Sequence, residues 1–121
     1  MQSKHDIGQR LVKFSSNVIR LLSQNESGKA VRHIADQLLR SATSVGANYE
    51  EARAAESKTD FAHKMQVSLK EMREAYYWLA VMIEASIVTS DDSDDIYDEA
   101  RQLRSILSKA VATAKANYKK P

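Results

Sequence analysis

The stretch that decides the fold is residues 31–52, VRHIADQLLRSATSVGANYEEA, in which apolar side chains recur at alternating intervals of three and four residues. The apolar positions are Val31, Ile34, Leu38, Ala42, Val45, Tyr49 and Ala52. This spacing brings them onto one face of an α-helix and matches the repeat of helices that pack in bundles. Gly46 interrupts the helix at a cost of about 1 kcal/mol relative to alanine. Close approach by a neighbouring backbone would explain that cost.

The same apolar repeat continues on both sides of this stretch, which predicts three further amphipathic helices. The expected helices cover residues 4–23, 28–54, 58–86 and 92–117. Short connections make chain neighbours antiparallel, so the predicted fold class is all-α, an up-and-down antiparallel four-helix bundle. At 121 residues, the chain fits a single domain spanning residues 1–121.

Polar residues between the helices indicate where each one begins. Ser27 is expected to cap the second helix, and Ser57 with Asp60 forms a variant of the capping box for the third. The acidic segment 89–95, TSDDSDD, suits the positive end of a helix dipole, so the fourth helix is expected to begin near Ser90 or Ser93.

Composition excludes several classes of protein. Three glycines and one proline provide few turns, which favours helices over a sheet. The chain has no cysteine, so disulfides, thiolate zinc sites and cysteine nucleophiles are excluded. No segment approaches the roughly 20 apolar residues of a membrane span. We therefore expect a soluble cytoplasmic protein with no membrane partner.

Residues 36–52, DQLLRSATSVGANYEEA, resemble the signature of the bacterial four-helix-bundle proteins first noticed in intervening sequences of large-subunit ribosomal RNA genes. The polar positions of that signature are occupied by Gln37, Arg40, Ser44, Asn48 and Glu51. Segments 60–65 and 69–79 look like the third helix of the family, so the resemblance covers roughly residues 5–115. Two positions depart from the pattern: many members have an arginine where Leu39 stands and a proline where Gly46 stands.

The resemblance implies a non-enzymatic homo-oligomer, typically a homopentameric ring of bundles. The family is also similar to the accessory protein of diversity-generating retroelements, a basic barrel that binds nucleic acid and a reverse transcriptase. The partners expected on this basis are further copies of the chain and, as an alternative, nucleic acid or a nucleic-acid enzyme.

The polar residues of the signature form a stripe beside the apolar face of their helix, because Arg40, Ser44, Asn48 and Glu51 are separated by four, four and three residues. One interpretation is a binding site. The other is a structural hydrogen-bond network that fixes how the helices align, as single polar residues do in coiled coils. We predict the structural role.

No catalytic, metal or cofactor-binding residues are predicted. A di-metal bundle needs inward glutamates and two Glu-x-x-His pairs, whereas the sequence offers only Asp60-x-x-His63, in which Asp60 is better explained as a cap residue. The HEPN ribonucleases have an arginine four to six residues before a histidine, a spacing that this sequence lacks. We therefore predict that the chain is not an enzyme and identify no small-molecule substrate or cofactor.

Two non-enzymatic functions remain open. The first is a scaffold or interaction module, with Tyr76, Tyr77 and Trp78 as the candidate interface, because three adjacent aromatics cannot all face the core of one bundle. The second is sequence-independent binding of RNA or DNA through basic surfaces that a ring would repeat. The candidate contacts are Lys4, Arg10, Lys13 and Arg20 in the first helix and Arg101, Arg104, Lys109, Lys115, Lys119 and Lys120 in the last.

Overall fold

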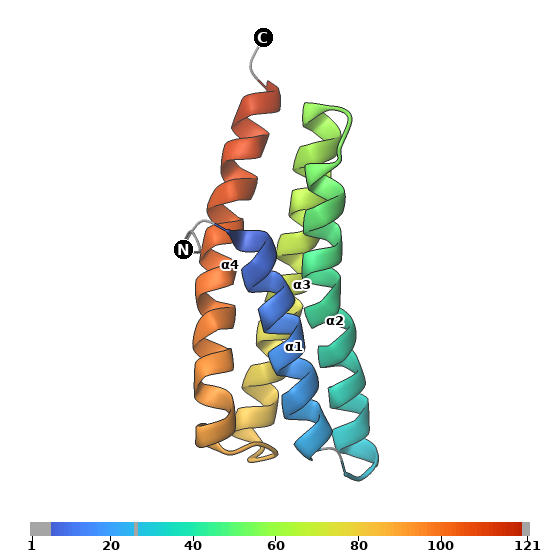
Figure 1. Cartoon of the computed structure of the whole chain (residues 1–121), viewed down its shortest axis with the longest axis vertical. Helices are drawn as coiled ribbons and strands as arrows, with labels where there is room; N and C mark the ends of the chain where they lie inside the picture. The colour runs from blue at the N-terminus through green and yellow to red at the C-terminus, as the bar shows by residue number, and fades with distance from the viewer. Residues whose placement is uncertain (1–5, 26, 120–121) are drawn as a thin grey trace.

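The structure is a computed structural model that describes residues 6–25 and 27–119, with side chains described as far as residue 117. Four helices account for nearly all of these residues, and no strand occurs within them. The helices are α1 (Ile7–Asn25), α2 (Lys29–Arg53), α3 (Lys58–Glu84) and α4 (Ser90–Lys119). They run alternately up and down (Figure 1), which confirms the predicted four-helix bundle.

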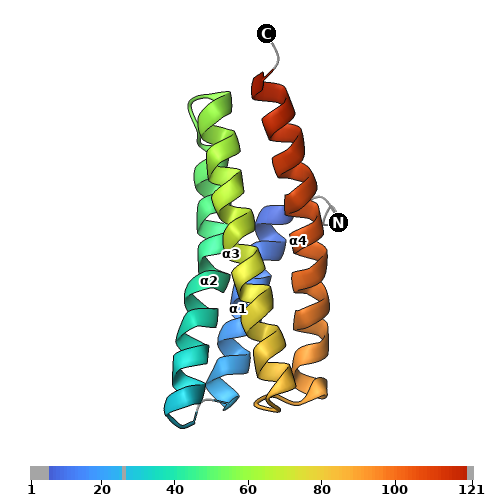
Figure 2. The same ribbon diagram turned by 180° about the vertical axis from the view of Figure 1, so that it is seen from behind.

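The helices follow one another around the bundle. α1 packs against α2 and α4, and α3 packs against the same two helices from the other side. The seam between α1 and α2 therefore lies opposite the seam between α3 and α4, as the front and back views show (Figures 1 and 2). α1 has 19 residues and α4 has 30, so one end of the bundle consists of α2, α3 and α4 alone (Figure 1).

The apolar stripes expected from the sequence meet in one continuous core. The largest fully buried side chains include Leu11, Phe14, Leu38, Met65, Met72, Leu79, Met82, Leu103 and Leu107. Burying each such side chain stabilises the fold by about 1.5–3 kcal/mol. The alternation of threes and fours thus identified the buried face of each helix correctly.

Helix starts show where cap prediction worked and where it did not. The Ser57 hydroxyl accepts a hydrogen bond from the amide of Asp60 at 3.0 Å, which confirms the predicted cap of α3. The expected cap by Ser27 is wrong: Gly28 occupies the N-cap of α2 with φ 78° and ψ 162°, and no side chain of the described residues caps this helix. This backbone conformation is essentially restricted to glycine.

Gly46 of α2 faces α1. A Cβ atom at this position would lie 3.4 Å from the Cβ atom of Leu11, so the neighbour is a side chain of α1 and not the backbone we expected. One turn away, the Ser15 hydroxyl donates a hydrogen bond to the carbonyl of Ala42 at 3.3 Å. Small side chains therefore bring the two helices together along this seam.

Candidate functional site

The polar stripe of the family signature connects α2 to α3 at two points. Arg40 donates a hydrogen bond to Glu71 at 2.9 Å and also binds Glu74. Near the other end of α2, Lys64 of α3 forms an ion pair with Glu51 at 3.3 Å. The hydrogen bond to Glu74 is the main reason why the pKa of Arg40 is raised above its usual value.

The other members of the stripe bond within their own helix. The Ser44 hydroxyl donates to the carbonyl of Arg40 at 2.7 Å, and the Asn48 amide donates to the carbonyl of Ser44 at 2.8 Å. The carbonyl of Gln37 accepts a hydrogen bond from the hydroxyl of Ser41 at 2.9 Å. Arg40 and Glu51 are thus the two stripe residues whose side chains link helices.

The three adjacent aromatics of α3 have three different surroundings. The ring of Tyr76 stacks on Tyr97 of α4, with 4.6 Å between centroids, and Arg104 lies 4.3 Å from the Tyr76 centroid. A hydrogen bond with Tyr76 is the main cause that raises the pKa of Tyr97, and burial of Tyr97 raises it further. Tyr76 therefore joins α3 to α4 within one bundle.

Trp78 makes contacts on the opposite flank of α3. Its ring meets His33 of α2 edge-on at 6.3 Å, and its indole N–H donates to Glu74 at 3.4 Å. Tyr77 is 58% exposed, and its ring packs edge-on against Trp78 at 5.0 Å. Of the candidate interface residues, Tyr77 alone projects mainly into solvent.

Several of the predicted nucleic-acid contacts bond to other side chains of the chain. Arg10 binds Glu99 of α4 through two nitrogen atoms, at 2.9 and 2.6 Å, and this hydrogen bonding raises the pKa of Arg10. Arg101 binds Asp98 at 2.6 Å, which lowers the pKa of that carboxyl group. Arg20 donates to the side chain of Asn17 at 3.0 Å.

The remaining predicted contacts are scattered. Lys13 and Lys109 are exposed, on α1 and α4, and Lys115 extends from α4 toward α3. Lys4 and Lys120 lie outside the described residues, and the side chain of Lys119 lies outside them as well. The described candidates therefore lie on α1 and α4, and their role as nucleic-acid contacts stays a prediction.

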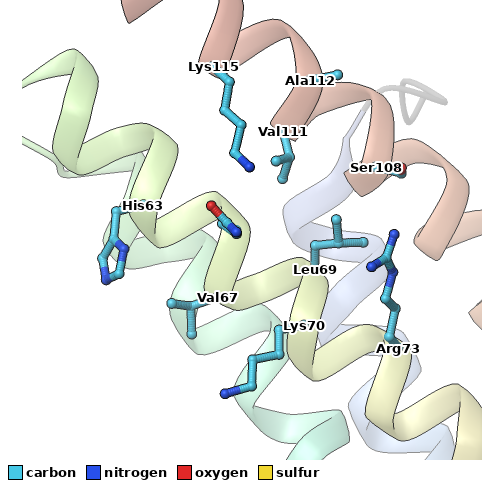
Figure 3. A pocket seen from close by; sticks show the side chains of 10 residues that line it. His63, Val67, Leu69, Lys70, Arg73, Ser108, Val111, Ala112 and Lys115 are labelled. Carbon is cyan, nitrogen blue, oxygen red and sulfur yellow. The ribbon is translucent and has the colours of Figure 1, made fainter.

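A basic groove between α3 and α4 combines Lys115, a predicted contact, with residues that the sequence interpretation did not select. His63, Lys70 and Arg73 of α3 and Lys115 of α4 line it, above apolar side chains that include Val111. Arg73 and Lys115 extend from opposite helices into the space between them, whereas His63 and Lys70 project from the outer side of α3 (Figure 3). We call this feature the α3–α4 groove.

The cations of the α3–α4 groove have no acidic partner among the described residues. Within the part of the chain that the structure describes, Lys70, Arg73 and Lys115 form no ion pair or side-chain hydrogen bond. The two glutamates of this part of α3, Glu71 and Glu74, lie on the other flank, bound to Arg40. The spacing of Lys70 and Arg73, three residues apart, could have indicated two cations close together on one helix. That Lys115 of α4 joins them could be learned only from the fold.

The seam between α1 and α2 carries exposed aliphatic side chains. Val12 and Ile19 of α1 are 67% and 47% exposed, and Leu39 of α2 is 39% exposed. The contact between Ser15 and Ala42 sets the antiparallel alignment, which places Leu39 beside Ile19. We call these three residues the α1–α2 apolar seam.

Neither a metal centre nor a membrane span is found among residues 6–25 and 27–119. No cluster of three or more histidine, aspartate or glutamate side chains is arranged there to hold a metal ion. None of the described helices combines the length and apolar character that crossing a bilayer requires.

Comparisons with known proteins agree with the fold. No curated protein matches the chain. The crystal structure of a protein of unknown function from the S23 ribosomal protein family of Bacteroides thetaiotaomicron superimposes with a TM-score of 0.75 at 28% identity, covering 87% of this chain and 97% of that one. The model of the 23S rRNA-intervening sequence protein family matches residues 3–109. The chain therefore belongs to the 23S rRNA-intervening sequence protein family.

Proposed function

We propose that the protein is a non-enzymatic building block that associates with further copies of itself. The α1–α2 apolar seam is the observation that carries the proposal. Isolated exposed aliphatic residues are common on protein surfaces, but these three lie together along one pair of helices. Covering Val12, Ile19 and Leu39 with a second copy would remove their apolar surface from water.

Three hydroxyl groups along the seam do not oppose burial. The hydroxyls of Ser16, Ser23 and Thr43 donate to the carbonyls four residues earlier in their own helices, at 3.0, 2.8 and 2.8 Å. Hydroxyls that already donate within the helix lose little when water is excluded. The seam therefore suits a close contact between helices of two copies.

The proposed assembly is a homopentameric ring, as the family resemblance implies. In a ring, each copy offers two different surfaces, because the contacts are head-to-tail. The α1–α2 apolar seam is one of these surfaces. The proposal places the assembly in the cytoplasm, where newly made copies of the chain meet.

Light scattering coupled to size-exclusion chromatography tests this proposal on the intact chain. The unmodified protein should have about five times the 13.6 kDa mass of one chain. Ile19→Asp combined with Leu39→Asp should yield smaller particles with unchanged helical circular dichroism, because charged side chains resist burial. Ser105→Asp, on the exposed outer side of α4, is the matched control and should leave the mass unchanged.

Two results of this experiment would contradict the proposal. If the double variant stays folded and keeps the mass of the unmodified protein, the α1–α2 apolar seam is not the interface. If the unmodified protein has the mass of one chain at micromolar concentration, self-association itself is contradicted.

Binding of nucleic acid is the second candidate function, and the α3–α4 groove is the observation that favours it. Lys70, Arg73 and Lys115 have no acidic partner among the described residues, so their charges are available to phosphates. The groove lies on the opposite face from the α1–α2 apolar seam, so assembly through that seam would leave it open. A ring would repeat it in every copy.

Fluorescence anisotropy with a labelled 20-nucleotide RNA at 50 and 200 mM salt tests this second function. Lys70→Glu with Arg73→Glu should weaken binding at low salt by tenfold or more, about the effect of removing two cations that bind phosphates. Lys29→Glu with Arg32→Glu makes the same charge change on exposed positions of α2 and serves as the control. If the two double variants lose the same amount of affinity, net charge alone determines binding. If the unmodified protein does not bind the RNA at 50 mM salt, nucleic-acid binding is excluded.

A further inference from the structure

We propose that the α3–α4 groove binds single-stranded nucleic acid, with a base stacked on Tyr77. This inference rests on the second proposed function and specifies its ligand. It starts from three side chains on one stripe of α3: His63, Lys70 and Tyr77, each seven residues from the next, are all exposed. Seven residues are two turns of helix, about 10.5 Å.

Tyr77 offers a flat apolar surface where the cations end. Its ring is 58% exposed and is supported from one side by the edge-on contact with Trp78. A supported ring loses little conformational freedom when a base stacks on it. Arg73 lies one turn before Tyr77 on α3 and adds a positive charge to the same stretch of the helix. This combination of an aromatic platform with neighbouring cations is typical of sites for unpaired strands.

The floor of the groove is apolar and its rims are basic. Leu69 of α3 and Val111 of α4 line it where the two helices face each other (Figure 3). A suitable ligand therefore carries negative charge at its edges and has apolar faces to bury. An unpaired strand meets both conditions, since its phosphates and its base faces are accessible together.

A duplex fits this surface less well. Its bases stack on each other inside the helix, so Tyr77 and the apolar floor would gain nothing from it, and only the phosphates would contact the protein. The stripe from His63 to Tyr77 spans 14 residues, about 21 Å, which accommodates several nucleotides of a single strand. We therefore expect preference for single strands without strong preference for sequence.

The test compares a labelled 20-nucleotide deoxythymidine strand with a mixed-sequence 20-base-pair duplex at 50 mM salt, using the full chain. The single strand should bind at least tenfold more tightly than the duplex. Tyr77→Ala should weaken single-strand binding about tenfold, within the range for removing one stacked base, and leave duplex binding unchanged. Tyr77→Phe keeps the ring and should bind like the unmodified protein. Quenching of Trp78 fluorescence by the strand offers a second readout.

The outcomes separate this inference from the function on which it rests. Equal affinity for both probes, or an unchanged affinity of Tyr77→Ala for the single strand, overturns the single-strand inference and leaves nucleic-acid binding intact. Absence of binding to either probe overturns both. A loss of affinity in Tyr77→Phe equal to that in Tyr77→Ala would also contradict stacking. Circular dichroism and solution mass confirm that each variant is folded and assembled.

Discussion

Arg40 of α2 binds Glu71 of α3 at 2.9 Å, and the same guanidinium also holds Glu74. Between residues 63 and 77, these two glutamates are the only acids. With both glutamates bound to Arg40 of α2, Arg73 extends from this segment toward α4, and Lys70 projects from the outer side of α3 (Figure 3). Arg40, an arginine of the family signature, thus joins two helices and holds the two acidic side chains of this part of α3 on the side toward α2.

The first prediction concerns the ion pair of Arg40. Glu71 is only 8% exposed, so Arg40→Met leaves a largely buried carboxylate without its partner. We expect the free energy of unfolding to fall by about 1–3 kcal/mol, measured by urea denaturation. Arg53→Met removes an exposed pair with Glu50 and should cost about 0.5 kcal/mol or less. Equal effects of the two substitutions would show that burial of Glu71 does not matter.

Gly28 and Gly46 should respond to substitution in opposite ways. Gly28 has a positive φ, so Gly28→Ala should destabilise the protein by about 1–3 kcal/mol although no atom of the described residues lies within 4 Å of the new Cβ. Gly46 is helical, and its new Cβ would meet Leu11 at the short end of van der Waals contact. Gly46→Ala should therefore stabilise by up to about 1 kcal/mol, and Gly46→Leu should destabilise by about 1–3 kcal/mol. Thermal denaturation of the three variants would measure this, and a stabilising Gly28→Ala would contradict the backbone argument.

Local patterns predicted local structure well. The spacing of apolar residues fixed the buried face of each helix, and Ser57 with Asp60 fixed the start of α3, because both depend on residues within one or two turns. The prediction that Ser27 caps α2 was wrong. Serine is a common N-cap residue, but here Gly28 supplies the backbone conformation that the turn needs.

The candidate surfaces depended on contacts between distant residues. Arg10 was predicted to face a ligand, but it meets Glu99, 89 residues along the chain, a pairing that no local pattern reveals. Lys115 was predicted as a nucleic-acid contact of the fourth helix, yet the other basic residues that line its groove are on α3. The position of Leu39 in the α1–α2 apolar seam likewise depends on how closely α1 approaches α2.

Replacing each of two fully buried serines should change the free energy of unfolding by different amounts. The hydroxyl of Ser68 on α3 donates to the carbonyl of Val45 on α2 at 2.8 Å, whereas that of Ser41 donates to Gln37 within its own helix at 2.9 Å. Ser68→Ala removes a link between helices and should cost about 1 kcal/mol of unfolding free energy. Ser41→Ala loses a bond that does not stabilise the helix and should change stability by less than about 0.5 kcal/mol. The reverse order in chemical denaturation would mean that local strain, not the link between helices, decides the cost.

The last prediction places a negative charge in the α3–α4 groove without removing any cation. Ser108 lines the groove on α4, on the side toward which Arg73 extends (Figure 3), so Ser108→Asp should attract that guanidinium and repel phosphates. Ser105→Asp makes the same change three residues earlier, on the outer side of α4, and leaves the groove untouched. At 50 mM salt we expect Ser108→Asp to weaken binding of the 20-nucleotide single strand about tenfold more than Ser105→Asp, since only the first lies where phosphates bind. The salt dependence should separate them too, because the slope of log affinity against log salt falls by about 0.7 for every phosphate that the protein no longer neutralises. Parallel slopes for the two variants would show that the strand binds elsewhere on the bundle.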